Sequence, residues 1–96
     1  MDKLSSMKVF IRVVEANSFS LAATQLGIGS AAVTRSIASL EKSLGVKLME
    51  RTTRRISLTA AGAAYLDCCR KVLRMIESTE SDLAGQTLAL SGPIRV

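Results

Sequence analysis

The sequence predicts a mainly α-helical fold with three helices, a small β-hairpin and one long final helix. Three observations predict this fold. Apolar residues recur at helical spacing between residues 4 and 44, with breaks at Asn17 and Gly27. The spacing changes to alternation between Gly45 and Thr59, as in a pair of strands. Helical spacing then returns over a segment that is longer than a small domain needs.

The first two predicted helices are short and amphipathic. Residues 4–16 form the first, because their apolar side chains fall on one face. Ser18 is placed to cap the second, since its hydroxyl can accept a hydrogen bond from an unpaired backbone N–H. The second helix ends at residue 26, where Gly27 serves as the C-terminal glycine.

The third predicted helix starts at Gly29 or Ser30 and is closed by Gly45. Its buried side holds four apolar residues, Val33, Ile37, Leu40 and Leu44. The other side carries one long basic side chain and otherwise small groups: Ser30, Ala31, Thr34, Arg35 and Ser39. A solvated helix face is usually richer in Glu and Lys, so this face suits close approach to another surface.

The hairpin is predicted between Gly45 and Thr59. Apolar residues alternate with polar ones on both sides of a basic tip at residues 51–55, namely Val46 and Leu48 before it and Ile56 and Leu58 after it. Two strands alone are marginally stable, so we expect the hairpin to pack on the helices.

Thr59 is predicted to cap the last helix, which continues to about Gln86 over roughly 40 Å. A near-heptad stripe runs along it: Tyr65, Cys69, Val72, Ile76, Thr79 and Leu83. Such a stripe needs a cover, which a second copy of the helix would supply. Gly92 and Pro93 then break the helix before an alternating apolar segment that resembles a cut strand. A disordered terminal tag is the alternative for this tail.

The composition limits the classes of function. The 96 residues, 48% apolar and 22% charged, suit one small globular domain. The net charge of +5 arises in residues 1–58, which carry nine Lys and Arg against four Asp and Glu, and positive charge favours a polyanionic partner. No apolar run has the length of a membrane span and no signal peptide is present, so we expect a cytoplasmic protein without membrane contact. Adjacent Cys68 and Cys69, with no His, suit neither a disulfide nor a metal site.

The turn at residues 27–29 joins two helices into a helix-turn-helix, whose second helix fits the major groove of DNA. Arg35 could there bind a guanine with two donors. The hairpin follows directly, so Arg54 and Arg55 could reach the neighbouring minor groove. Two alternatives remain open, a plain three-helix bundle and a merely solvated hairpin turn.

Several segments resemble the LysR-type transcriptional regulators in order and spacing, and the resemblance covers nearly all 96 residues. The segments are NSFSLAATQL at 17–26, AVTRSI at 32–37, LE at 40–41, LGVKL at 44–48, ERT at 50–52 and LTAAG at 58–62. The resemblance implies a bacterial transcription regulator with a winged helix-turn-helix and paired linker helices. It divides the chain into a DNA-binding domain at 1–58, a linker and dimerisation helix at 59–88, and a hinge at 89–96 that starts a missing effector-binding domain.

The resemblance also implies roles for single residues. The residues expected to face base edges are Ser30, Ala31, Thr34 and Arg35, and Arg54 or Arg55 is expected to enter the minor groove. The residues expected to hold phosphates are Ser20, Ser36 and Arg51. The stripe from Tyr65 to Leu83 is expected to contact the second copy.

The chain departs from the family where Gly29, Ser30 and Ala31 replace the frequent Ser, Gln and Pro, and where Thr34 replaces Ser. Loss of the Gln removes a bidentate reader of adenine. Met49 replaces the usual Phe, a change that we expect the flexible Met side chain to tolerate.

Sequence-specific binding of double-stranded DNA by a homodimer is thus the first hypothesis, with a tetramer as the alternative for the full-length protein. A protein-interaction domain that never touches DNA is the second, because the uncovered stripe suits it equally, although it would not need a basic hairpin. We expect no enzyme and no catalytic residue, since the sequence lacks His, a plausible carboxylate pair and a phosphate-binding Gly loop. No cofactor is expected in this fragment, whereas a small-molecule effector is expected for the carboxy-terminal domain.

Overall fold

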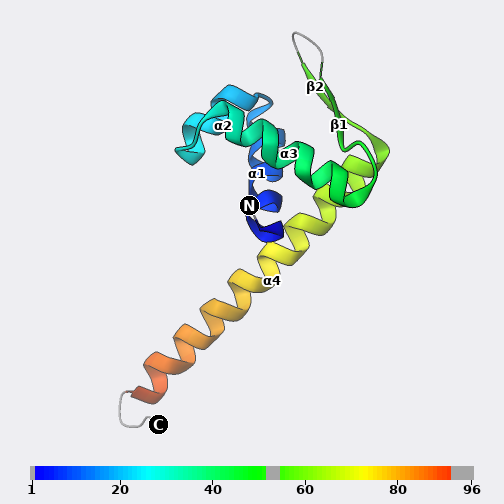
Figure 1. The fold of residues 1–96 in the computed structure, drawn as a ribbon. Helices are drawn as coiled ribbons and strands as arrows, with labels where there is room; N and C mark the ends of the chain where they lie inside the picture. Colours follow the sequence, from blue (N-terminus) through cyan, green and yellow to red (C-terminus); the bar gives the residue numbers. More distant parts are fainter. Residues whose placement is uncertain (1, 52–54, 92–96) are drawn as a thin grey trace.

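The structure, a computed structural model, describes the backbone of residues 2–51 and 55–91 and the side chains up to residue 85. Its elements follow the chain in the order α1 (Lys3–Ala16), α2 (Phe19–Leu26), α3 (Ser30–Leu44), β1 (Met49–Arg51), β2 (Ile56–Leu58) and α4 (Ala60–Ser91). The three short helices pack together, the strand pair projects from one corner, and α4 leaves the domain as a rod (Figure 1). The mainly α-helical prediction, with a wing and a long last helix, is therefore confirmed.

The predicted caps set the helix boundaries. The Ser18 hydroxyl accepts a hydrogen bond of 3.0 Å from the Leu21 N–H at the start of α2. Gly27 and Gly45 end α2 and α3 in the left-handed conformation, with φ of 72° and 75°. Asn17 ends α1 in the same way at φ 54°, which a short polar side chain tolerates. Local sequence signals therefore determine where α1 gives way to α2 and where α3 ends.

The core lies where α1, α2 and α3 meet, and α4 and β1 complete it. Phe10, Val13 and Val33 are fully buried at its centre. Leu66 and Cys69 reach into it from α4, and Met49 from β1. The first part of α4 is thereby fixed on the domain, and Met49 fills a buried position.

The strand pair is shorter than predicted and starts later. It is antiparallel, with Met49 opposite Leu58 and Arg51 opposite Ile56. The strand predicted from Val46 is wrong in its start, because β1 begins only at Met49. The Leu48 N–H donates to the Glu41 carboxylate at 2.8 Å, and the Leu48 carbonyl accepts from the Thr59 N–H at 3.0 Å. The tip, residues 52–54, lies outside the described residues.

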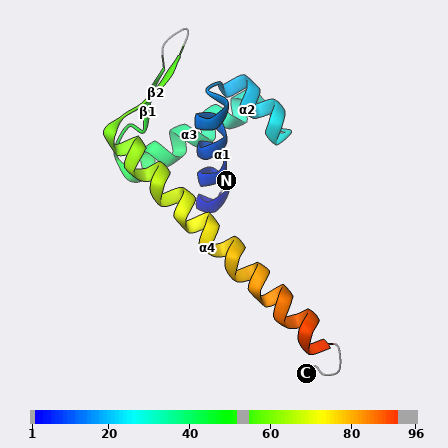
Figure 2. The same cartoon turned by 180° about the vertical axis from the view of Figure 1, so that it is seen from behind.

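The last helix extends beyond its predicted end at about Gln86 and continues to Ser91. Residues 86–91 contain no Gly or Pro, and the breaking pair Gly92-Pro93 follows them directly. The end of α4 lies apart from the other elements in both views (Figures 1 and 2). The predicted tail strand lies outside the described residues. Among the described helices, none combines the length and hydropathy that a membrane span requires.

Candidate nucleic-acid interface

One face of α3 is exposed and carries the four residues predicted to read bases. Ser30, Ala31, Thr34 and Arg35 are all exposed, while Val33 and Ile37 on the other side are buried. Small side chains surround a single long cation, so another surface can approach the helix backbone closely.

Two hollows flank this face. Thr34 lines one of them together with Phe19, Lys47 and Arg51, on the side toward the wing. Arg35 lines the other with Ala32, Ser36 and Ser39 of the same helix. Successive helical residues differ by about 100° in direction, so Thr34 points toward the wing and Arg35 away from it. The two side chains would therefore contact different parts of a bound partner.

Ser36 does not belong to the exposed face. Its side chain is 3% exposed, and its hydroxyl donates a hydrogen bond of 3.2 Å to Ser6 Oγ on α1. A buried hydroxyl that joins two helices cannot reach a phosphate without a rearrangement of the core. The predicted phosphate role of Ser36 is corrected to a contact between α1 and α3.

The wing brings Arg51 to the start of α2. The guanidinium carbon of Arg51 lies 3.8 Å from the centroid of the Phe19 ring. Ser20 follows Phe19 directly, is exposed, and has its hydroxyl 3.2 Å from that of Ser18. Arg51 therefore contacts the residue directly before Ser20, and both are residues predicted to hold phosphates.

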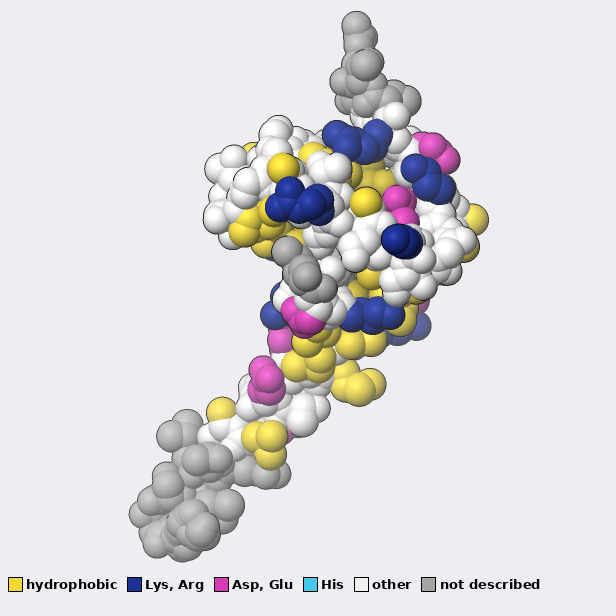
Figure 3. Space-filling view, in the orientation of Figure 1, with side chains coloured by type: hydrophobic (Ala, Val, Ile, Leu, Met, Phe, Trp, Pro, Cys, Tyr) yellow, Lys and Arg dark blue, Asp and Glu magenta, His cyan; other side chains and the backbone are white. Residues whose placement is uncertain are grey.

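The wing cations are only partly described. Arg55 is exposed and directly precedes β2, whereas Arg54 lies outside the described residues. Lys and Arg side chains are spread over the face that carries α3 and the base of the wing (Figure 3). This face has the charge that a polyanion requires.

Sequence reasoning missed three residues beside this interface. Ala38 and Lys42 are exposed on α3, four and eight residues after Thr34, and Lys47 lines the hollow with Arg51. The step of four residues from Thr34 was a signal that could have found the first two.

The base of the wing is joined to α3 and to α4. The Glu41 carboxylate accepts from the N–H groups of Leu48 and Met49, at 2.8 and 3.4 Å. The Thr59 hydroxyl donates to the Lys47 carbonyl at 2.7 Å and accepts from the Gly62 N–H at 2.9 Å. The wing is therefore placed relative to the exposed face of α3 by bonds at its base.

The predicted dimer stripe is divided by the structure. Its first part belongs to the domain's own core: Cys69 is 0% exposed, Val72 packs against the core, and the Tyr65 ring lies 6.1 Å from that of Phe10. Burial raises the pKa of the Cys69 thiol to about 11, and the neighbouring Cys68 thiol adds to the shift. Burial likewise raises the pKa of the Tyr65 hydroxyl. Cys69 is therefore corrected from an interface residue to a core residue.

The mainly exposed side of α4 overlaps the predicted stripe only in part: it shares Val72 and Thr79 with the stripe, and elsewhere it lies one residue earlier or adds a small side chain. We call this side the α4 seam; it consists of Ala61, Ala64, Cys68, Val72, Met75 and Thr79. Met75 is 69% exposed, and farther along the helix the predicted Leu83 is 55% exposed. At its start the seam continues into an apolar groove formed with Leu44 and Val46. Ile76 is half-buried beside it.

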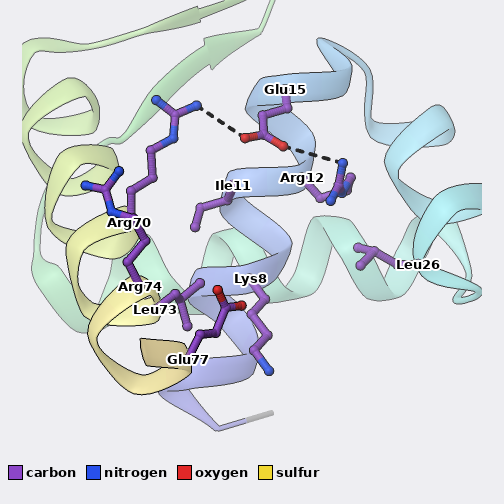
Figure 4. A pocket seen from close by; sticks show the side chains of 9 residues that line it. All are labelled: Lys8, Ile11, Arg12, Glu15, Leu26, Arg70, Leu73, Arg74 and Glu77. Atoms are coloured by element: carbon purple, nitrogen blue, oxygen red, sulfur yellow. Dashed lines mark hydrogen bonds and ion pairs between the residues drawn. The ribbon is translucent and has the colours of Figure 1, made fainter. Parts of the chain in front are cut away.

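A second groove lies between α1 and α4, with a volume of about 600 Å³. In the close view the lining side chains of α1 and α4 lie in front of α3, which passes behind α1 (Figure 4). Glu15 lies 3.4 Å from both Arg12 and Arg70 and so bridges the two helices. Of the two ion pairs, only that between Glu15 and Arg70 joins α1 to α4. Among the described residues, no His, Cys, Asp and Glu side chains cluster as a metal site would require.

Comparison with known proteins gives one consistent family. The sequence profile of the bacterial regulatory helix-turn-helix proteins, lysR family, matches residues 4–63. An HTH-type transcriptional repressor of Pseudomonas aeruginosa is 47% identical over 96 residues, which are the whole of this chain and 30% of that protein. The chain spans between 23% and 33% of the length of other curated relatives, all HTH-type or quorum-sensing regulators.

Solved structures are similar over most of the chain. The DNA-binding domain of CbnR in complex with DNA has a TM-score of 0.82 at 35% identity, covering 88% of this chain and 98% of that one. The DNA-binding domain of BenM on catB site 1 DNA has a TM-score of 0.82 at 31% identity, covering 86% of this chain and 92% of that one.

Proposed function

The chain belongs to the lysR family of bacterial regulatory helix-turn-helix proteins, and from this premise we propose that it binds double-stranded DNA sequence-specifically as a homodimer and regulates transcription. The observation that carries the proposal is the exposed face of α3, whose side chains are small except for that of Arg35. This face lies beside β1, the strand of the wing that carries Arg51. The similar domains of CbnR and BenM were solved on DNA, which supports the same partner here.

The face of α3 reads the major groove in this proposal. Ala31 and Thr34 let the helix backbone approach the bases, Ser30 supplies a short hydroxyl at the start of the helix, and Arg35 donates two hydrogen bonds to a guanine. Because Thr34 and Arg35 point to different sides of the helix, they read different base pairs.

The wing and α2 hold the DNA backbone. Arg51 and Ser20 bind phosphate beside the N-terminus of α2, where unpaired backbone N–H groups favour an anion. Arg54 or Arg55 enters the minor groove, which Arg side chains favour where it is narrow. Ser36 has no part in this proposal, because it is buried.

Fluorescence anisotropy with a duplex selected from random sequence tests the proposal. Arg35→Ala is expected to cost about 1–3 kcal/mol of binding free energy on that duplex and to remove discrimination at one base pair. Arg51→Ala is expected to weaken selected and scrambled duplexes alike and to reduce the slope of log affinity against log salt by about one. Arg74→Ala, a matched loss of charge in the groove between α1 and α4, is expected to leave both affinities unchanged.

Equal affinity of the unaltered protein for selected and scrambled duplexes would contradict sequence-specific binding. Insensitivity to salt would contradict contact with phosphate, and the alternative of a protein-interaction domain would then be favoured.

The homodimer forms along the α4 seam in our proposal. Residues 60–74 carry Arg70, Lys71 and Arg74 against Asp67, whereas residues 75–85 carry three acidic residues and no Lys or Arg. Two antiparallel helices would place the positive half of each beside the negative half of the other. They would also bring Ala61 and Ala64, which are small, opposite the larger side chains of the far half.

The chain is, in our proposal, the amino-terminal part of a longer cytoplasmic regulator. The relatives are about three times its length, which supports a DNA-binding domain at 1–58, a linker helix at 59–88 and a hinge from 89 into a further domain. That domain would bind a small-molecule effector, and tetramers would use it as well. Native mass spectrometry of the full-length protein with candidate effectors tests both statements.

A further inference from the structure

The contact between Arg51 and Phe19 joins two elements that are distant in the sequence. Phe19 is the first residue of α2, and Arg51 is the last residue of β1. The Arg51 guanidinium carbon lies 3.8 Å from the centroid of the Phe19 ring, so the planar cation lies over the ring face. The Phe19 side chain is 8% exposed and belongs to the hydrophobic core, which fixes the ring in place.

We propose that Phe19 is a positioning residue for DNA binding, which holds the Arg51 guanidinium beside the N-terminus of α2 so that Arg51 binds a backbone phosphate of DNA. The inference rests on the proposed DNA binding. It adds Phe19, which has no role in the proposed function above. Phe19 itself does not touch DNA in this arrangement.

Stacking leaves the binding capacity of the guanidinium intact. The contact uses a face of the group, while its five N–H donors lie in the plane and point outward. Among the described residues, no carboxylate forms an ion pair with Arg51. Phosphate, which accepts two parallel hydrogen bonds from one guanidinium, is the ligand that these donors suit.

The ring also reduces the cost of holding Arg51. A long side chain that is ordered on binding loses rotamer freedom, and this loss weakens binding by about 2- to 12-fold for each such side chain. In this structure the buried ring restricts Arg51 before DNA arrives. The same contact ties the wing to α2, so Arg51, Thr34 and Lys47 line one hollow.

A double-mutant cycle on DNA affinity tests the inference. Phe19→Leu keeps an apolar side chain but removes the ring, and it is expected to weaken binding about 3- to 10-fold. Phe19→Tyr keeps the ring and is expected to bind within twofold of the unaltered protein. In an Arg51→Ala background, Phe19→Leu is expected to change affinity by less than twofold, because the side chain that it positions is absent. An equal loss from Phe19→Leu with and without Arg51 would overturn the inference.

A measurement without DNA keeps the test independent of the proposed function. The NMR resonance of the Arg51 Nε–H is expected to be shifted upfield by the ring current in the unaltered protein and in Phe19→Tyr, and to lose this shift in Phe19→Leu. Absence of the shift in the unaltered protein would refute the stacking. If Phe19→Leu fails to fold, Phe19→Met replaces it, because methionine keeps a large apolar side chain without the ring. Phe19→Met is then expected to weaken binding about 3- to 10-fold when Arg51 is present and by less than twofold in the Arg51→Ala background, and an equal loss in both backgrounds would overturn the inference.

The failures of the two proposals are distinguishable. If Arg51→Ala weakens no duplex, Arg51 does not bind phosphate and that part of the proposed function is wrong. If Arg51→Ala weakens every duplex but shows no coupling to Phe19, the proposed function stands and the positioning role is wrong.

Discussion

Neighbouring residues of the helices have opposite environments, and this decides which of them can act on a partner. Arg35 is exposed while Ser36 is 3% exposed, and Cys68 is exposed while Cys69 is fully buried. A step of one residue turns a helix by about 100°, enough to move a side chain from solvent into the core. A role that is assigned to a residue because its position matches the family's pattern therefore holds only if its side chain is accessible.

The two cysteines give a direct test of this assignment. With a disulfide-forming thiol reagent at pH 8, and at a protein concentration low enough to keep the chain monomeric, Cys68 is expected to react at once. Cys69 is expected to react only after unfolding. The physical reason is that Cys69 is buried and its pKa is raised to about 11, so its thiolate is scarce at pH 8. Cys68→Ser is the variant that should abolish the fast reaction, and Cys69→Ser the control that should keep it.

The pH dependence of stability follows from the same shift. A raised pKa means that the folded protein holds the Cys69 proton more tightly than the unfolded chain does. This contribution to the free energy of unfolding is complete below pH 9, the ordinary pKa range of a thiol, and is lost as pH rises to about 11. Rapid labelling of both thiols in the native protein at pH 8 would show that Cys69 is accessible, and would contradict the burial from which this pH dependence follows.

Periodicity predicted the exposed face of α3 because the face repeats within one helix. It could not predict the environment of Ser36, since serine is compatible with both solvent and core. Its hydrogen-bonding partner, Ser6, is 30 residues away and comes close only through the packing of α1 on α3. The contact between Phe19 and Arg51 was out of reach for the same reason.

At the scale of the elements, the wing and α4 depend on one close approach of backbones. A Cβ atom at Gly62 would overlap the Leu48 carbonyl and press on the Leu58 side chain. Thr59 bonds the same stretch through its N–H and its hydroxyl. Glu41 of α3 bonds to this stretch as well. The helix α3, the wing and the helix α4 therefore share one junction.

Substitution at this junction should move the wing and α4 apart. Gly62→Ala is expected to lower the free energy of unfolding by roughly 1–3 kcal/mol, because the added methyl group has no space. Gly85→Ala is the matched control in the same helix: nothing lies within 4 Å of its Cβ position, and alanine favours helix by up to about 1 kcal/mol. Thermal unfolding of the two variants measures the difference. Equal melting temperatures would show that α4 does not rest on Leu48 as described.

The bounds of α2 and the start of α4 were predictable because capping residues act locally, as Ser18, Gly27 and Thr59 do. The start of β1 was not, because Val46 and Leu48 alternate as strand residues do, whereas the Leu48 N–H donates to the Glu41 carboxylate of α3. An alternating pattern reports which side chains are buried and leaves the strand partner undetermined.

At the scale of the whole molecule, α4 is both part of the core and the proposed dimer element. The stripe predicted from the sequence combined these two roles. Its residues up to Val72 pack in or against the core, whereas those farther along the helix, such as Leu83, are exposed. Only packing could separate them: Tyr65 and Cys69 turn toward α1, which leaves Ala64 and Cys68 on the side that is exposed.

A charge placed in the α4 seam should therefore separate the dimer while leaving the domain folded. Met75→Asp is expected to raise the dimer dissociation constant at least 100-fold, because it would bury a carboxylate in an apolar contact, and Met75 is 69% exposed in the single chain. Ser81→Asp adds the same charge about 200° around the helix from Thr79 and serves as the control. Sedimentation velocity measures the oligomeric state of both variants.

The loss of the dimer has a consequence on DNA that tests the reading of two half-sites. A dimer that places two recognition helices about 34 Å apart binds a paired site far more tightly than either half, because the second contact is intramolecular. Met75→Asp is expected to bind one half-site as the unaltered protein does and to lose the additional affinity for the paired site. Ser81→Asp is expected to keep it. A Met75→Asp protein that remains dimeric at micromolar concentration would place the interface elsewhere than on the α4 seam.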